Sequence, residues 1–162
     1  MRKPAARLAL ADAVLESFRT NGRINRYLLE SVSDAAWRAD PPTGKGRPIA
    51  AIAAHMHNVR HMWLTVSAKG IRIPPKIHRD TVTRKQAIAA LAKSDEAMAR
   101  LIEPALRGDG RIRNFKPDVA GFIGYLISHE AHHRGQISML ARQVGHPIAQ
   151  KVMFGMWEWG KR

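Results

Sequence analysis

The chain has 162 residues, which suits one domain with a single hydrophobic core and is short for two. It contains no cysteine, so disulfides, thiolate metal ligands and a cysteine nucleophile are excluded, and any metal ion must be held by nitrogen and oxygen. The formal charge of +14 suits weak contacts with anionic partners, but the basic residues are scattered without interleaved aromatic residues, so we expect a basic soluble surface and no specific nucleic-acid site.

The start of the chain carries Asp12 and Glu16 where a signal peptide needs an unbroken apolar stretch. No run approaches the roughly 18 apolar residues of a membrane span. We therefore expect a cytoplasmic protein without a membrane partner. The same region predicts a long first helix, loosened near Gly22 and ending before Pro41. Its apolar residues recur every three or four positions: Leu8, Ala11, Leu15, Phe18, Ile24, Leu28 and Val32.

Start and stop signals predict three further helices. Their limits are Pro48 to Lys69, Thr81 or Thr83 to Pro104 or Gly108, and Asp118 to Gly145. The last stretch, Pro147 to Arg162, is too apolar for a free tail and is expected to pack across the other helices. We find no alternating strand pattern, and the connections are short enough to join antiparallel neighbours. The sequence therefore predicts an all-α four-helix bundle that forms a single domain over residues 1–162.

The fourth predicted helix carries histidines in its inward seam. Steps of three and four residues connect Val119, Phe122, Leu126, His129, His133, Gln136 and Leu140. His129 and His133 therefore interrupt an apolar stripe and project from one face, one turn apart. This geometry lets two imidazoles bind a single cation.

The second predicted helix shows the same anomaly at His55. This residue takes an apolar position in the series Ile52, His55, Val59, Met62 and Val66. Three imidazoles in an apolar interior leave several polar nitrogens to satisfy, and a metal ion satisfies three at once. We therefore predict a metal site at His55, His129 and His133 that keeps open positions for water or substrate. A hydrogen-bonded polar network or a solvent-filled cleft is the alternative that the pattern leaves open.

Other polar residues near these positions have less defined roles. His57 and His61 lie on a different face from His55, and we interpret them as solvent-facing, with a rival chelate as the alternative. His132 is adjacent to the seam and is our candidate catalytic residue, as a general base. The alternatives are that it supports a metal ligand or lies on the surface. Glu130 is expected to be solvated or paired with Arg134, four residues on.

The segments AAHMHNVRHMWL and SHEAHHRGQISMLARQVGHP, which carry these histidines, resemble the DinB-like family. That family is related to the bacillithiol transferases and to the metal-binding domain of mycothiol-dependent enzymes. The resemblance spans nearly the whole chain and implies an up-down-down-up bundle with a divalent metal ion on His55, His129 and His133. It also implies that Gly135 permits close helix packing and that Gln136 orients a ligand or bound water, with a plain interhelical hydrogen bond as the alternative for Gln136.

A divalent ion on three histidines lowers the pKa of bound water or thiol toward neutrality. The resemblance therefore implies a metal-dependent small-molecule enzyme, a thiol transferase or hydrolase, with a non-catalytic metal-binding or stress-related interaction protein as the alternative. Because the chain has no cysteine, a thiol such as bacillithiol, mycothiol or glutathione must come from solution. We expect zinc, with nickel or iron as the other candidates. We also predict a homodimer, formed through an exposed apolar helix face or the segment of Trp157 and Trp159, although those rings suit equally well the covering of their own bundle.

Overall fold

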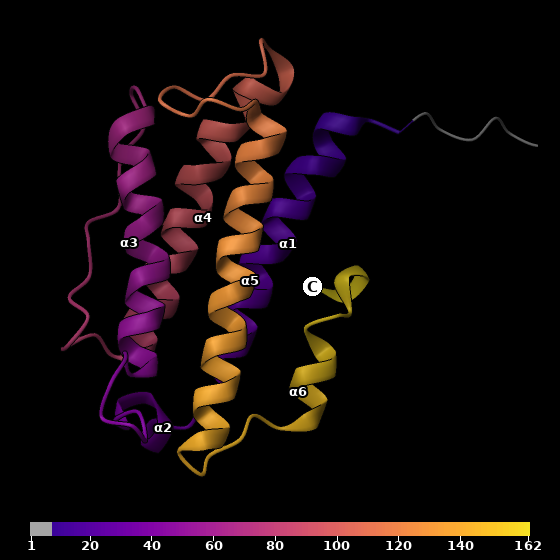
Figure 1. The fold of residues 1–162 in the computed structure, drawn as a ribbon. Coiled ribbons are helices and arrows are strands. Elements are labelled where there is room, and N and C mark those ends of the chain that lie inside the picture. Colours follow the sequence, from indigo (N-terminus) through magenta and orange to yellow (C-terminus); the bar gives the residue numbers. More distant parts are fainter. Residues whose placement is uncertain (1–7) are drawn as a thin grey trace, which may run out of the picture.

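The computed structural model describes residues 8–162, and all of its regular elements are helical. They are α1 (Leu10–Ser31), α2 (Asp34–Arg38), α3 (Ile49–Ser67), α4 (Arg84–Arg107), α5 (Val119–Gln143), α6 (Gln150–Gly155) and the 3-10 helix η1 (Trp159–Lys161). The four long helices pack side by side, which confirms the predicted all-α bundle (Figure 1). Within residues 8–162, no helix is both long and apolar enough to cross a membrane.

The bundle has the up-down-down-up topology that the family resemblance implies. In Figure 1, α1 and α5 run in one direction and α3 and α4 in the other. Consecutive helices α3 and α4 are thus parallel, and the segment between them, residues 68–83, returns along the length of the bundle. The expectation that every connection is short and joins antiparallel neighbours is therefore wrong at this segment.

The helix ends follow the predicted signals closely. Thr83 caps α4 through a capping box with Gln86, in which each side chain bonds the other residue's backbone N–H. Asp118 caps α5 by accepting a hydrogen bond from the backbone N–H of Gly121 at 2.8 Å. Helix α4 runs through Pro104 and ends at Gly108, so the second of the two predicted stops is the correct one.

Helix α1 is continuous through Gly22, where the sequence pattern predicts a loosening. The reason is close packing against α4: a Cβ atom at position 22 would lie 2.2 Å from Oδ1 of Asp95. A glycine at this point lets the two helices approach each other. Helix α1 ends at Ser31, so the prediction of one helix that continues to the residues before Pro41 is wrong: Val32 and Ser33 are extended, and the short α2, capped by Ser33, follows.

A layer of polar side chains divides the core into two hydrophobic clusters. One cluster contains Leu28, Met56, Leu91 and Ile137, and the other contains Phe18, Leu64, Met98 and Leu126, among further residues. Between them along each long helix lie polar residues: Asn21 and Asn25 on α1, Arg60 on α3, Ser94 and Asp95 on α4, and Glu130 on α5. All six are buried.

Arg60 is the centre of this polar layer. Its side chain is completely buried, and its Nε donates to Oε1 of Glu130 at 2.6 Å while Nη2 donates to Oε2 at 2.9 Å. Nη1 donates to Oδ1 of Asp95 at 2.6 Å. The side-chain amides of Asn21 and Asn25 donate to the same Glu130 carboxylate. One guanidinium thus links α3 to α4 and α5, and the carboxylate extends the network to α1.

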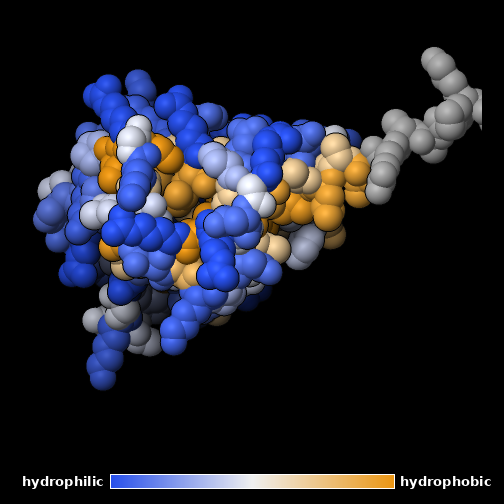
Figure 2. Space-filling view, turned by 90° about the horizontal axis from the view of Figure 1, so that it is seen from above, coloured by the Kyte–Doolittle hydropathy of each residue, from blue (hydrophilic) through white to orange (hydrophobic). Residues whose placement is uncertain are grey.

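The C-terminal segment packs on the bundle only in part. Val152, Met153 and Met156 lie against the hydrophobic cluster of Leu28, as predicted, but Phe154 and Trp157 are 66% and 79% exposed. Exposed apolar side chains also gather where α1 begins, at the end of the bundle that Figure 2 shows, next to an otherwise mostly hydrophilic surface.

We predict that Arg60→Met lowers the free energy of unfolding by about 3–5 kcal/mol, because it leaves the buried Glu130 carboxylate without a cationic partner, while Asp95 keeps its ion pair with Arg26. Urea denaturation followed by circular dichroism measures the loss. Arg107→Ala is the matched control: this arginine pairs with Asp12 and Glu103 on the exposed surface, so its removal changes the stability by less than about 1 kcal/mol. A parent-like stability of Arg60→Met would contradict the central role of the network.

Candidate metal centre

The structure brings His55 of α3 together with His129 and His133 of α5. Nε2 of His129 lies 3.3 Å from Nε2 of His55 and 3.1 Å from Nε2 of His133. One ligand nitrogen from each residue lies within 4.8 Å of the others, and these residues form the only such group of metal-ligating side chains found among residues 8–162. Three imidazole nitrogens, carried by two helices, thus converge on one region.

Two of the three separations between the nitrogens fit a first-row metal ion. A tetrahedral zinc ion with Zn–N bonds of about 2.0–2.1 Å separates its ligand nitrogens by roughly 3.3 Å. The two observed separations, 3.1 and 3.3 Å, agree with this value. Hydrogen bonds between the rings can satisfy the same nitrogens only if some of them carry protons, whereas a cation satisfies all three lone pairs.

Gln136 fixes the orientation of one of the rings. Its Oε1 accepts a hydrogen bond from Nδ1 of His133 at 2.7 Å, which leaves Nε2 of that ring unprotonated and directed at the cluster. Gln136 therefore lies beside the cluster and contacts a ring within its own helix, not a group on another helix. This is the type of support that a metal-binding histidine ordinarily has.

The surroundings favour the neutral form of all three imidazoles. Burial lowers the pKa of His55 to about 4, and the charges of His133, Arg47 and His129 act in the same direction. Burial is also the largest cause of the lowered pKa values of His129 and His133. Protons therefore do not compete for the lone pairs near neutral pH.

One side of the cluster is aromatic and another is basic. The ring of Tyr125 lies nearly parallel to that of His129, at a centroid distance of 6.1 Å and an interplanar angle of 20°. Tyr125 in turn contacts Trp63 and Phe115. The exposed Arg47 is near enough for its charge to lower the pKa values of His55 and His133.

His132, the candidate catalytic residue, lies outside the cluster. It is exposed, and its ring centroid is 5.1 Å from that of His133 in an edge-on arrangement. It therefore neighbours a predicted ligand without joining the convergent nitrogens.

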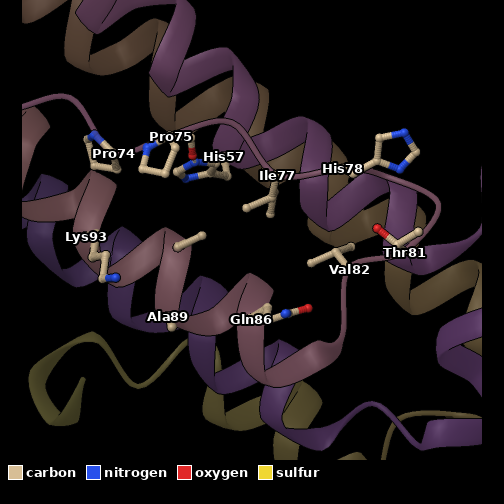
Figure 3. Close-up of a pocket in the computed structure, with 11 residues that line it drawn as sticks. His57, Pro74, Pro75, Ile77, His78, Thr81, Val82, Gln86, Ala89 and Lys93 are labelled. Carbon is tan, nitrogen blue, oxygen red and sulfur yellow. Dashed lines mark hydrogen bonds between the residues drawn. The ribbon is translucent and has the colours of Figure 1, made fainter.

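The solvent-facing interpretation of His57 is wrong, because the segment between α3 and α4 covers this face. His57 is completely buried and its Nε2 donates to the carbonyl of Pro75 at 2.9 Å. His61 is partly buried and its Nδ1 bonds the carbonyl of Pro74 at 2.8 Å. His57 lines a cavity of about 300 Å³ between this segment and α4, with Lys93 on the opposite wall (Figure 3).

Two further expectations on α5 need correction. Glu130 is 1% exposed and pairs with Arg60, so it is neither solvated nor paired with Arg134. Burial by itself raises the pKa of the Glu130 carboxyl, but the charge and hydrogen bonds of Arg60, together with the hydrogen bonds from Asn25 and Asn21, outweigh burial, and the pKa is lowered. Gly135 does not serve close helix packing, since a Cβ atom there would meet nothing within 4 Å.

The polar layer next to the cluster is the part that sequence reasoning missed. A usable signal was present in α1, where Phe18, Asn21, Asn25 and Leu28 follow the same three- and four-residue steps that revealed the histidines. Arg60, a charged residue inside the apolar run of α3, was a second signal. Glu130 gave none, since it is offset by one residue from the seam.

Comparisons with known proteins agree with this architecture. A crystal structure of a proposed DinB family member from Exiguobacterium sibiricum 255-15 has the same fold, with a TM-score of 0.62 and 17% sequence identity, covering 91% of this chain and 99% of that one. No curated protein matches the chain. The family model of the DinB family matches residues 7–155. The chain therefore belongs to the DinB family.

Proposed function

We propose that this protein binds one divalent metal ion, zinc in the first instance, through His55, His129 and His133, and that it uses the ion as a small-molecule enzyme, a thiol transferase or hydrolase. The observation that carries the proposal is the convergence of three neutral Nε2 atoms at 3.1 and 3.3 Å spacing. The proposal also takes residues 1–162 as a single domain.

The composition of the site favours catalysis over a structural role. Structural zinc sites are closed by four protein ligands, whereas catalytic sites have three and leave a position for water or substrate. The group of side chains found among residues 8–162 contains three histidines and no fourth ligand. His55 and His129 are partly exposed, so a small molecule can approach the open side.

The ion, when bound, supplies a Lewis acid that makes water or a thiol nucleophilic near neutral pH. The chain's own residues orient the ligand rings and bind the substrate. Gln136 holds the His133 ring through Nδ1, and Tyr125 gives the substrate a flat apolar wall beside His129. Arg47 supplies positive charge that favours an anionic substrate or cosubstrate. His132, one residue from His133 and exposed, is the candidate group for moving a proton to or from solvent.

The absence of cysteine from the chain determines which thiol chemistry is open to it. A thiol transferase of this composition must take its sulfur from a low-molecular-weight cosubstrate such as glutathione, bacillithiol or mycothiol. The basic surface and Arg47 suit cosubstrates that carry carboxylates.

We predict about one equivalent of metal per chain in protein purified without an affinity tag, and a loss of at least about 90% of it in His55→Ala and His133→Ala. Elemental analysis measures the content, and circular dichroism shows that the variants remain helical. His132→Ala is the matched control and retains its metal, because this exposed ring does not share the convergence point. Metal that persists in both ligand variants would place the ion elsewhere.

The neutral state of the ligands gives a pH test on metal-free protein. In the unfolded chain these histidines titrate near the ordinary value of 6.5, whereas the folded state lowers their pKa values, that of His55 to about 4. Between these limits the unfolded chain binds more protons, so the free energy of unfolding decreases as the pH falls from about 7.5 to about 5. Urea denaturation at several pH values measures the slope. The slope becomes shallower in His55→Leu and is unchanged in His132→Asn. A stability that does not depend on pH would refute the lowered pKa values of the cluster.

Catalysis itself is tested with the zinc-loaded protein, a low-molecular-weight thiol and a bimane electrophile, followed by fluorescence. We expect thiol transfer above the uncatalysed rate with at least one of the three thiols, and a decrease to background in His133→Ala. His132→Ala is expected to lower kcat and to change its pH profile while metal content stays the same. Full metal occupancy without turnover on any thiol or on ester substrates would favour the non-catalytic role.

A further inference from the structure

A cleft of about 640 Å³ lies between α5 and the C-terminal segment, a size typical of small-molecule sites. We call it the C-terminal cleft. Its lining includes Arg134, Gly135, Ser138, Met139, Met153 and Trp157. Figure 1 shows how α6 and the chain end lie beside α1 and α5 to form this side of the molecule.

The C-terminal cleft is separate from the histidine cluster. Side chains advance by about 100° per residue along a helix, so Ala131, Gly135 and Ser138 lie on the side of α5 opposite His129 and His133. None of the histidines of the cluster lines the cleft. A ligand bound here therefore cannot reach a metal ion in the proposed centre.

A positioned cation lies in the wall of the cleft. Nη1 of Arg134 donates to the side-chain oxygens of Asn21 and Asn25, which hold the guanidinium in place. No other hydrogen bond from this guanidinium is formed with the described residues, so Nε and Nη2 are free to donate. Arg142 adds a second positive charge, and none of the described residues that line the cleft is acidic.

The rest of the lining is apolar apart from one hydroxyl. Oγ of Ser138 is buried and has no hydrogen-bond partner among the described residues. Met139 and Trp157, which border the cleft, are 49% and 79% exposed, an amount of apolar surface that a ligand would cover. Methionine side chains adapt their shape to apolar ligands of different outline.

We propose that the C-terminal cleft binds a small amphipathic carboxylate. Its carboxylate accepts hydrogen bonds from Nε and Nη2 of Arg134, with the positive charge of Arg142 in the same lining. Its apolar body lies against Met139, Met153 and Trp157. We infer an anionic head group because the lining contains two arginines and no acidic residue. We infer an apolar body because the remaining walls are mostly apolar. This site stands independently of the proposed metal-dependent activity.

Isothermal titration calorimetry with decanoate, and with decanol as the uncharged analogue, tests the site. We expect one decanoate per chain and an affinity about tenfold or more above that for decanol, since a charge-assisted pair to arginine is lost with the carboxylate. Arg142→Gln, whose side chain is exposed, weakens decanoate severalfold and leaves decanol unchanged. Equal affinities for the two probes, or no binding of decanoate, would overturn the proposal.

Two glycines of α5 provide matched variants that block or spare the cleft. A Cβ atom at Gly135 or at Gly124 would meet nothing within 4 Å, so a side chain can begin at either position without a clash, but only Gly135 lines the cleft. Gly135→Leu should fill it and lower the decanoate affinity about tenfold or more, while Gly124→Leu stays within about twofold of the parent. Equal effects of the two variants would overturn the assignment.

Two further measurements distinguish the C-terminal cleft from the metal centre and from a dimer interface. Decanoate affinity should be unchanged in metal-free protein and in His133→Ala; a loss there would mean that the carboxylate binds the metal centre. Analytical ultracentrifugation should show the same mass with and without decanoate. A dimer that decanoate or Gly135→Leu dissociates would show that a second copy of the chain occupies the cleft, and would overturn the proposal.

Discussion

The contact between Arg60 and Glu130 constrains the rest of the structure more than any apolar contact does. Apolar packing tolerates small shifts of one helix along another, whereas a buried guanidinium loses most of its stabilisation when its acceptors move by an ångström. Because the same two side chains also bond Asp95, Asn21 and Asn25, all four long helices are held at one level. The polar layer therefore defines the relative height of the helices, and the two hydrophobic clusters fill the space above and below it.

The histidine cluster depends on that level. His129 directly precedes Glu130, and His55 lies five residues before Arg60, so the ion pair that joins α3 to α5 also sets the separation of the rings. A flexible site would have to order its ligands each time a metal ion binds. In the proposed metal centre the backbone that carries the histidines is already fixed by charges that do not themselves face the site, and such preorganisation limits the entropy cost of binding.

How much the sequence could reveal depended on where each residue's partner lies. His129 and His133 interrupt a buried apolar series, so their own helix shows that they are unusual, and the ends of α4 and α5 follow from local capping chemistry. The inward seam predicted around His55 is wrong in its second half, because Met62 and Val66 are 44% and 41% exposed. Glu130 and His57 were misjudged because their surroundings come from elsewhere in the chain: Arg60 reaches Glu130 from α3, and residues 68–83 cover His57. Gly135 suits a close contact and an opening equally well, and only the position of the C-terminal segment decides between them.

Helix α5 presents three different surfaces around its circumference: the histidines toward α3, Glu130 toward the polar layer, and Gly135 with Ser138 toward the C-terminal cleft. A substitution alters one of these surfaces and spares the others. A deletion or insertion of a single amino acid within α5 would instead turn everything beyond it by about 100° and misalign all three together. Length variation in relatives of this chain should accordingly be confined to the connections between helices, while the stretch from Phe122 to Arg142 keeps a constant number of residues.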